Sequence, residues 1–169
     1  MKNNRIALFA IVAALPLAAA EMPQAGQTAP EFSLPSQDGS TIGIKEFRGK
    51  WVVLYFYPKD GTTGCTIEAH NFQQDLPKYD AAKAVIVGVS VDSTDSHKDF
   101  CAKQGLTFKL LADTDKKIVD EYGSLGARGV ATRNTFLIDP SGKIVKVWTN
   151  VNPNVHSKEV LETLGSMER

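Results

Sequence analysis

The chain has 169 residues and a mass of 18.4 kDa, which suits one domain of ordinary size and is too short for two. Apolar residues make up 43% and charged residues 22%, which excludes a disordered chain, a collagen-like repeat and a polytopic membrane protein. Nineteen Lys and Arg residues balance nineteen Asp and Glu residues. No long-range field therefore favours nucleic acid or an anionic membrane, and we expect neither as a partner.

Residues 1–20 are predicted to be a secretory signal peptide. The only charges before Glu21 are two basic residues near the start, and residues 6–15 form an apolar run. A site of small residues ends at Ala20, which completes the pattern of a cleaved signal. A transmembrane anchor is the alternative, but the run is shorter than the roughly 20 residues that a bilayer requires. We therefore expect residues 21–169 to form the mature domain, in a secreted or periplasmic, oxidising location.

The first predicted strands of the mature chain precede a strongly apolar one. Residues 32–34 and 41–44 have strand character, and Asp38-Gly39 between them is typical of a hairpin turn. Residues 51–57 form a nearly continuous run of β-branched and aromatic side chains, which predicts a strand buried on both faces. Pro58 ends this strand because proline has no N–H to continue the ladder.

Helices and strands then alternate. A helix is predicted to begin near Thr62, since apolar residues recur there at spacings of three and four. Residues 84–91 predict a second buried strand. Residues 96–104 predict a helix, because polar capping residues 93–95 come before it and Gly105 comes after it.

The last third of the chain completes the predicted sheet. Residues 108–111 favour a strand and residues 115–122 a short helix. Residues 135–138 and 143–148 favour two antiparallel strands joined by a Pro- and Gly-containing turn, and residues 156–164 favour a helix. Two βαβ units followed by a hairpin and a helix predict an α/β domain with a mixed central sheet and helices on both faces. This is a thioredoxin-like layout, which by itself assigns no chemistry.

Cys65 is the strongest candidate for a chemical role. It follows the predicted strand 51–57 and lies in the first turn of a helix, where the helix dipole and unpaired N–H groups favour a thiolate. Ligand crevices in open α/β sheets form at such strand ends. A buried structural cysteine is the alternative. Residues 61–64 are all Gly or Thr, however, and such neighbours favour a reactive thiolate over a core residue.

Residues 58–65 read Pro-Lys-Asp-Gly-Thr-Thr-Gly-Cys. This segment resembles the Pro-x-x-x-Thr-x-x-Cys pattern of peroxiredoxin active sites, and the chain is similar to the peroxiredoxin Q (bacterioferritin comigratory protein) branch. Residues 56–60, 88–92 and 133–139 also match this branch, in the same order along nearly the whole mature chain. The resemblance implies a thiol peroxidase for hydrogen peroxide and organic hydroperoxides that is a monomer and needs no cofactor.

The resemblance assigns roles to the residues around the peroxidatic Cys65. Pro58 would shield one side of the thiolate pocket, although it would end the strand in any case. The Thr62 hydroxyl would contact a peroxide oxygen, with a plain helix cap as the alternative. The N–H groups of Gly64 and Cys65 would point at the departing oxygen and stabilise its negative charge.

The resemblance also implies a catalytic arginine. Arg133 would hold the Cys65 thiolate and polarise the O–O bond of the peroxide, whereas an arginine before a strand is otherwise usually a solvated surface charge. Glu68 lies one helical turn after Cys65 and would orient this arginine. A surface carboxylate favoured by the helix N-terminus is the alternative for Glu68.

The implied reaction leaves Cys65 as a sulfenic acid, which a second thiol must capture. Some members of the branch carry that thiol five residues after the first, where this chain has His70. Others place it on the following helix, and Cys101 matches that arrangement. We therefore expect a Cys65–Cys101 disulfide that a thioredoxin-like protein reduces. Because a disulfide needs Cα atoms within about 7 Å, both segments are expected to unwind locally. A packing role for Cys101, with an external thiol as resolving group, is the alternative.

The sequence gives less support to two other functional classes. A non-enzymatic metal-binding module would draw on the histidines His70, His97 and His156, but their spacings fit no zinc pattern. We expect no metal and interpret these three residues as solvated surface histidines. A thioredoxin-type disulfide oxidoreductase would need a Cys-x-x-Cys motif, and Glu68 occupies the place of its second cysteine.

Overall fold

The computed structural model describes residues 21–167 of the chain. The predicted signal peptide therefore lies outside the described residues. Within them, no helix combines the length and the apolar character needed to cross a membrane.

The centre of the described domain is a five-stranded mixed sheet in the order β5-β4-β3-β6-β7. Its strands are β3 (Trp51–Phe56), β4 (Ala84–Ser90), β5 (Lys109–Ala112), β6 (Asn134–Ile138) and β7 (Ile144–Trp148). Strands β3, β4 and β5 are parallel to one another, whereas β6 is antiparallel to both β3 and β7. The predicted N-terminal hairpin is confirmed as β1 (Ser33–Pro35) and β2 (Thr41–Gly43), which the short 3-10 helix η1 (Ile44–Phe47) follows.

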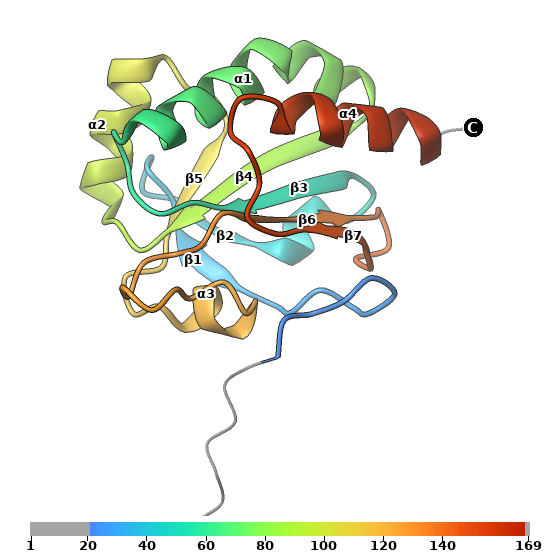
Figure 1. The fold of residues 1–169 in the computed structure, drawn as a ribbon, viewed down its shortest axis with the longest axis horizontal. Helices are drawn as coiled ribbons and strands as arrows, with labels where there is room; N and C mark the ends of the chain where they lie inside the picture. Colours follow the sequence, from blue (N-terminus) through green and yellow to red (C-terminus); the bar gives the residue numbers. More distant parts are fainter. Residues whose placement is uncertain (1–20, 168–169) are drawn as a thin grey trace, which may run out of the picture.

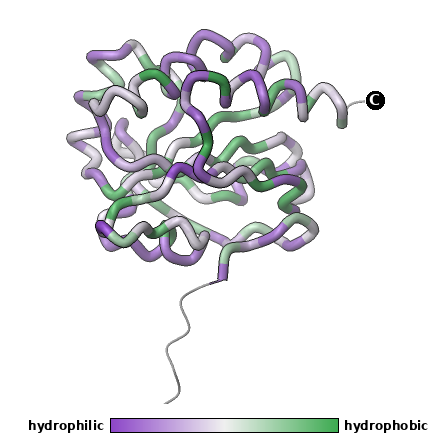
Figure 2. Tube along the Cα trace, in the orientation of Figure 1, coloured by the Kyte–Doolittle hydropathy of each residue, from purple (hydrophilic) through white to green (hydrophobic). Residues whose placement is uncertain are grey.

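Strand β3 is buried on both faces, as its sequence predicts. Val52, Leu54 and Phe56 pack into a core that also contains the β1–β2 hairpin and the helix α3 (Lys117–Glu121). Val53 and Tyr55, which point the other way, pack into a second core beneath three helices, α1 (Thr63–Ala81), α2 (Thr94–Gln104) and α4 (His156–Met167). Figure 2 shows apolar segments running through the central strands and polar segments on the outer surfaces of the helices. Full burial of one such side chain is worth about 1.5–3 kcal/mol, so β3 anchors both layers.

Helices cover both faces of this sheet, which confirms the predicted layout. In the described part of the chain they are α1 (Thr63–Ala81), α2 (Thr94–Gln104), α3 (Lys117–Glu121) and α4 (His156–Met167). Figure 1 shows α1 and α4 side by side over one face of the sheet and α3 on the opposite face with the β1–β2 hairpin. Helix α2 belongs to the same layer as α1 and α4, because its buried side chains pack in the same core cluster as theirs.

Helix α3 begins two residues later than the sequence predicts. The buried Asp113 carboxylate accepts a 2.7 Å hydrogen bond from the Val119 N–H and so caps the helix from outside. Lys116 adopts a left-handed backbone conformation, with φ of 65°, which delays the first helical turn to Lys117. Composition and periodicity do not reveal this arrangement.

The expected surface position of the histidines is wrong for two of the three. His70 is exposed, but His97 and His156 are both 0% exposed. His97 is hydrogen-bonded on both ring nitrogens, and His156 Nε2 lies 2.8 Å from the Thr135 hydroxyl. A polar ring becomes tolerable in a core when its nitrogens are paired, and the partners here come from distant parts of the chain.

Candidate active site

Cys65 lies in the first turn of α1, after the loop that leaves the central strand β3. The helix begins at Thr63, and Thr62 precedes it in an extended conformation. The Cys65 side chain is buried, with 2% of its surface exposed. Its sulfur therefore lies at the positive end of a 19-residue helix, which is a favourable place for an anion.

Arg133 reaches this sulfur from the neighbouring strand. Strand β6 pairs with β3 so that Asn134 lies opposite Phe56, and this register brings the residue before β6 to the end of β3 where the active-site loop begins. Arg133 Nη2 lies 3.5 Å from Cys65 Sγ. The sequence places Cys65 and Arg133 far apart, and the antiparallel register brings them into contact.

Glu68 holds the other side of the guanidinium. Its carboxylate forms an ion pair with Arg133 Nη1 and is 1% exposed, so the interpretation as a surface carboxylate is wrong. Burial raises the pKa of Glu68 to about 7, against the opposing effect of the Arg133 charge. Burial alone would lower the pKa of Arg133, but Glu68 and Cys65 raise it above its usual value. The guanidinium is therefore always charged and shared between a carboxylate and a sulfur.

The buried Glu68 predicts an unusual dependence of stability on pH. In the unfolded chain the carboxyl loses its proton near pH 4.5, but in the folded chain it does so near pH 7. As pH rises through this window, the unfolded state alone releases a proton, so the contribution of Glu68 to stability falls by roughly 3 kcal/mol. Urea unfolding of the wild type and Glu68→Gln at pH 4.5 and pH 8 should show the wild type losing stability relative to the variant. If the wild type instead gained stability relative to the variant as pH rises, the Arg133 charge would lower the pKa of Glu68 more than burial raises it.

Thr62 occupies the position before α1, but its side chain does not cap the helix. The Thr62 hydroxyl instead donates a 3.0 Å hydrogen bond to the Lys59 carbonyl within the same loop. This bond leaves the lone pairs of the exposed hydroxyl oxygen available as acceptors for a peroxide proton. Thr62 is therefore the N-cap residue of α1 by position, but its hydroxyl does not cap the helix.

Gly64 makes room for the arginine. A Cβ atom on Gly64 would lie 3.1 Å from Arg133 Nη2, so a larger residue would push the guanidinium away from the first turn. The N–H groups of Gly64 and Cys65 belong to that turn, where they have no partner within the helix. Pro58 and Arg133 are among the residues that line an adjacent groove of about 300 Å³. Its other lining residues come from the loop before β6 and from Asn150.

Cys101 lies on α2, as the sequence predicts, and is 8% exposed. Cys65 and Cys101 are both free thiols within the core beneath α1, α2 and α4. Burial, and to a smaller extent the charge of Asp60, raises the pKa of the Cys101 thiol to about 11. Tyr55 belongs to the same core, and burial raises the pKa of its hydroxyl, with further contributions from Glu68 and both cysteines. As packed here, Cys101 is a protonated and weakly nucleophilic thiol.

Sequence reasoning missed a polar cluster next to the site. Asp60, in the loop before Cys65, is hydrogen-bonded to Tyr57 and to Ser96 and His97 of α2. The matched segment 56–60 contains two of these residues, but no sequence signal pairs them with α2.

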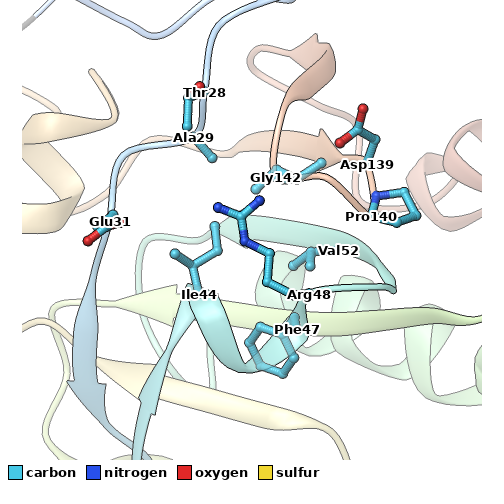
Figure 3. A pocket seen from close by; sticks show the side chains of 11 residues that line it. Thr28, Ala29, Glu31, Ile44, Phe47, Arg48, Val52, Asp139, Pro140 and Gly142 are labelled. Carbon is cyan, nitrogen blue, oxygen red and sulfur yellow. The ribbon is translucent and has the colours of Figure 1, made fainter.

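Within residues 21–167, neither a metal site nor the small cavity beside Val52 involves Cys65. No group of three or more His, Cys, Asp or Glu within residues 21–167 is arranged to hold a metal ion. A separate cavity beside Val52, near the start of β3, has a volume of about 20 Å³, enough for one water molecule. In Figure 3 the Arg48 side chain crosses it toward Gly142. A Cβ atom at Gly142 would clash with that guanidinium, so the cavity is narrow as well as small.

Comparison with known proteins identifies the family. Residues 25–147 match the model of the AhpC/TSA family. Peroxiredoxin Bcp of Bacillus subtilis is 39% identical over 149 residues, which cover 84% of this chain and 95% of that protein. Chloroplastic peroxiredoxin Q of Sedum lineare is 39% identical over 146 residues, covering 85% of this chain and 78% of that protein.

Solved structures agree with this assignment and confirm the thioredoxin-like peroxiredoxin fold. Peroxiredoxin Q of Xylella fastidiosa superimposes with a TM-score of 0.83 at 33% identity, covering 89% of this chain and 99% of that one. Bacterioferritin comigratory protein of Xanthomonas campestris gives a TM-score of 0.79 at 34% identity, with the same two coverages. The chain therefore belongs to the AhpC/TSA family of peroxiredoxins, in its peroxiredoxin Q branch.

Proposed function

We propose that Cys65 is the peroxidatic cysteine of this thiol peroxidase. The observation that carries the proposal is the contact of Arg133 with the Cys65 sulfur at the start of α1. A permanent positive charge and a helix N-terminus meet at one sulfur atom, and both stabilise a thiolate over a thiol. A merely structural cysteine does not need a half-buried guanidinium in contact with its sulfur.

The reaction is a nucleophilic displacement at oxygen. The thiolate sulfur attacks one peroxide oxygen, an S–O bond forms and the O–O bond breaks. The departing oxygen takes a proton and leaves as water or an alcohol, and Cys65 becomes a sulfenic acid. Arg133 and the N–H groups at the start of α1 face the charge that develops during this step, and the Thr62 hydroxyl orients the peroxide.

The groove beside Pro58 and Arg133 supports organic hydroperoxides as substrates in addition to hydrogen peroxide. Its walls include the small apolar side chains of Ala127, Val130 and Ala131. An alkyl group attached to the distal peroxide oxygen would find apolar surface there. The solved structures of the Xanthomonas campestris relative concern its alkyl peroxide reduction activity.

Cys101 is proposed to resolve the sulfenic acid. Its thiol attacks the oxidised Cys65 sulfur, which forms a disulfide and releases water. Because Cys101 is buried, with a raised pKa, α2 must open before this attack. A thioredoxin-like protein is the proposed donor of the two electrons that restore both thiols.

Replacement of Cys101 by serine tests this second step. The variant is expected to consume one equivalent of peroxide as fast as the wild type, since Cys101 takes no part in the first attack. Turnover with thioredoxin and thioredoxin reductase should be lost, because the sulfenic acid has no intramolecular partner. Peroxide consumption followed under single- and multiple-turnover conditions distinguishes the two steps. Undiminished thioredoxin-dependent turnover would instead support an external resolving thiol.

We also propose export of the protein to the periplasm or the cell exterior. The support is the basic and apolar pattern of residues 1–20, which ends in a small-residue site at Ala20. Expression of the full chain in a Gram-negative host should yield a periplasmic protein whose first residue is Glu21. Intact-mass measurement of the fractionated protein checks this, and a cytoplasmic protein that retains residues 1–20 would contradict it.

A further inference from the structure

A buried polar cluster ties the loop before Cys65 to the helix that carries Cys101. Asp60 lies in that loop, between Pro58 and Thr62. Ser96 and His97, from the first turns of α2, contact the same oxygen of its carboxylate, Oδ2, at 2.7 and 2.8 Å. The other oxygen, Oδ1, accepts a 2.7 Å hydrogen bond from the Tyr57 hydroxyl. We name the contacts of Asp60 with Ser96 and His97 the α2 clasp.

The clasp is anchored on both sides. His97 Nε2 lies 3.2 Å from the Leu111 carbonyl oxygen of β5, so the ring is held by the sheet as well as by Asp60. Both ring nitrogens therefore lie beside oxygen atoms, one on the loop before Cys65 and one on β5. On the other side, the Asp60 N–H donates a 2.9 Å hydrogen bond to the carboxylate of Asp92, just after β4. The Asp60 and His97 side chains are 7% and 0% exposed, so water does not compete freely for these contacts.

The α2 clasp is the polar part of what holds α2 against the domain, and the apolar part is the packing of Phe100 and Cys101 in the core. Three of its side chains are buried, those of His97, Phe100 and Cys101. His97 lies one helical turn before Cys101, so release of the clasp frees the turn adjacent to the cysteine. Cys101 reaches the oxidised Cys65 sulfur only when this part of α2 opens, and opening breaks the contacts with Asp60.

We propose that the α2 clasp sets the rate at which Cys101 resolves the Cys65 sulfenic acid. Asp60, Ser96 and His97 are then positioning residues, which act through the opening of α2 and do not touch the peroxide. The inference rests on the proposed resolving role of Cys101.

Two reactions compete for the sulfenic acid while the clasp is closed. Attack by Cys101 gives the disulfide and water. Attack on a second peroxide molecule gives the sulfinic acid, with water or an alcohol as the other product. A clasp that delays opening leaves more time for the second reaction, so it also sets the peroxide concentration at which the enzyme is inactivated.

The test compares His97→Ala with the wild type. After one equivalent of hydrogen peroxide, acid quenching and mass spectrometry give the rates of sulfenic acid and disulfide formation in the same sample. Loss of a hydrogen bond to a charged group should make the disulfide step about tenfold faster relative to the peroxide step. In the reduced protein, alkylation of Cys101, read from its own peptide, should accelerate by a similar factor. The sulfinic fraction at high peroxide should fall.

Two further variants distinguish a specific effect of the clasp from a general loss of stability. Ser96→Ala removes one of the two α2 contacts and should act in the same direction with a smaller effect, even where His97→Ala folds poorly. Tyr79→Phe is the matched control, because it removes a buried 2.8 Å hydrogen bond from Tyr79 to Ser157 that ties α1 to α4, away from α2. It should change neither the disulfide step nor the alkylation of Cys101.

The outcomes distinguish this inference from the proposed function. Unchanged or slower disulfide formation and unchanged Cys101 alkylation in His97→Ala would overturn the inference, as would an equal acceleration in Tyr79→Phe. Absence of any Cys65–Cys101 disulfide in the wild type would overturn the resolving role of Cys101 itself, and the inference with it. The alkylation rates would then still show whether the clasp holds α2 closed.

Discussion

Replacing Cys65 by serine is expected to reduce peroxide consumption to the uncatalysed rate. Serine keeps the size of the side chain, but its hydroxyl is a far weaker nucleophile than the sulfur that Arg133 contacts at the start of α1. The loss should be complete both in a single turnover and in thioredoxin-dependent turnover, with hydrogen peroxide or an organic hydroperoxide as substrate.

The Cys101→Ser variant is the matched control for this experiment. Both variants exchange one buried thiol for a hydroxyl, yet only the one at position 65 should lose the first turnover. Unfolding in urea shows whether both variants remain folded. A Cys65→Ser protein that still reduces one equivalent of peroxide would mean that another group carries out the first attack.

Replacing Arg133 by lysine is expected to lower the second-order rate constant for peroxide by about 10²-fold, the usual cost of removing one donor that stabilises a transition state. The guanidinium contacts Glu68 with one nitrogen and Cys65 with the other. A lysine ammonium has the same charge but no planar fork, so it cannot satisfy both partners at once. Stopped-flow measurement of the peroxide step, without any reductant, isolates this effect.

Arg48→Lys provides the matched control, since Arg48 lies beside the small cavity of Figure 3, away from Cys65. That variant should react with peroxide at the wild-type rate. An Arg133→Lys enzyme with an unchanged peroxide step would show that charge alone suffices and that the two-sided contact has no catalytic role.

The sequence predicts the fold well because its elements depend on local patterns. The apolar run at residues 51–57 is confirmed as the central strand β3, and alternation along it divides its side chains between two cores. The position of Cys65 at the start of a helix follows from the same reasoning. The start of α3 does not, because it depends on the Asp113 carboxylate capping Val119 and on the left-handed backbone of Lys116.

Contacts between distant residues mark the limit of prediction from this one sequence. Glu68 could be either a surface carboxylate or a partner of Arg133, and the register of β6 against β3 decides in favour of the partner. His97 and His156 look like surface residues in the sequence, since their partners lie elsewhere in the chain. The α2 clasp is missed for the same reason, although Asp60 lies inside the most informative segment.

The most direct test of the account is the covalent state of the reduced protein after one equivalent of hydrogen peroxide. Intact-mass spectrometry followed by peptide mapping should show the loss of two hydrogen atoms and a single linked peptide that joins Cys65 to Cys101. A stable oxygen adduct on Cys65 beside an unmodified Cys101 thiol would contradict the resolving step. Oxidation that begins at Cys101 and spares Cys65 would contradict the account as a whole.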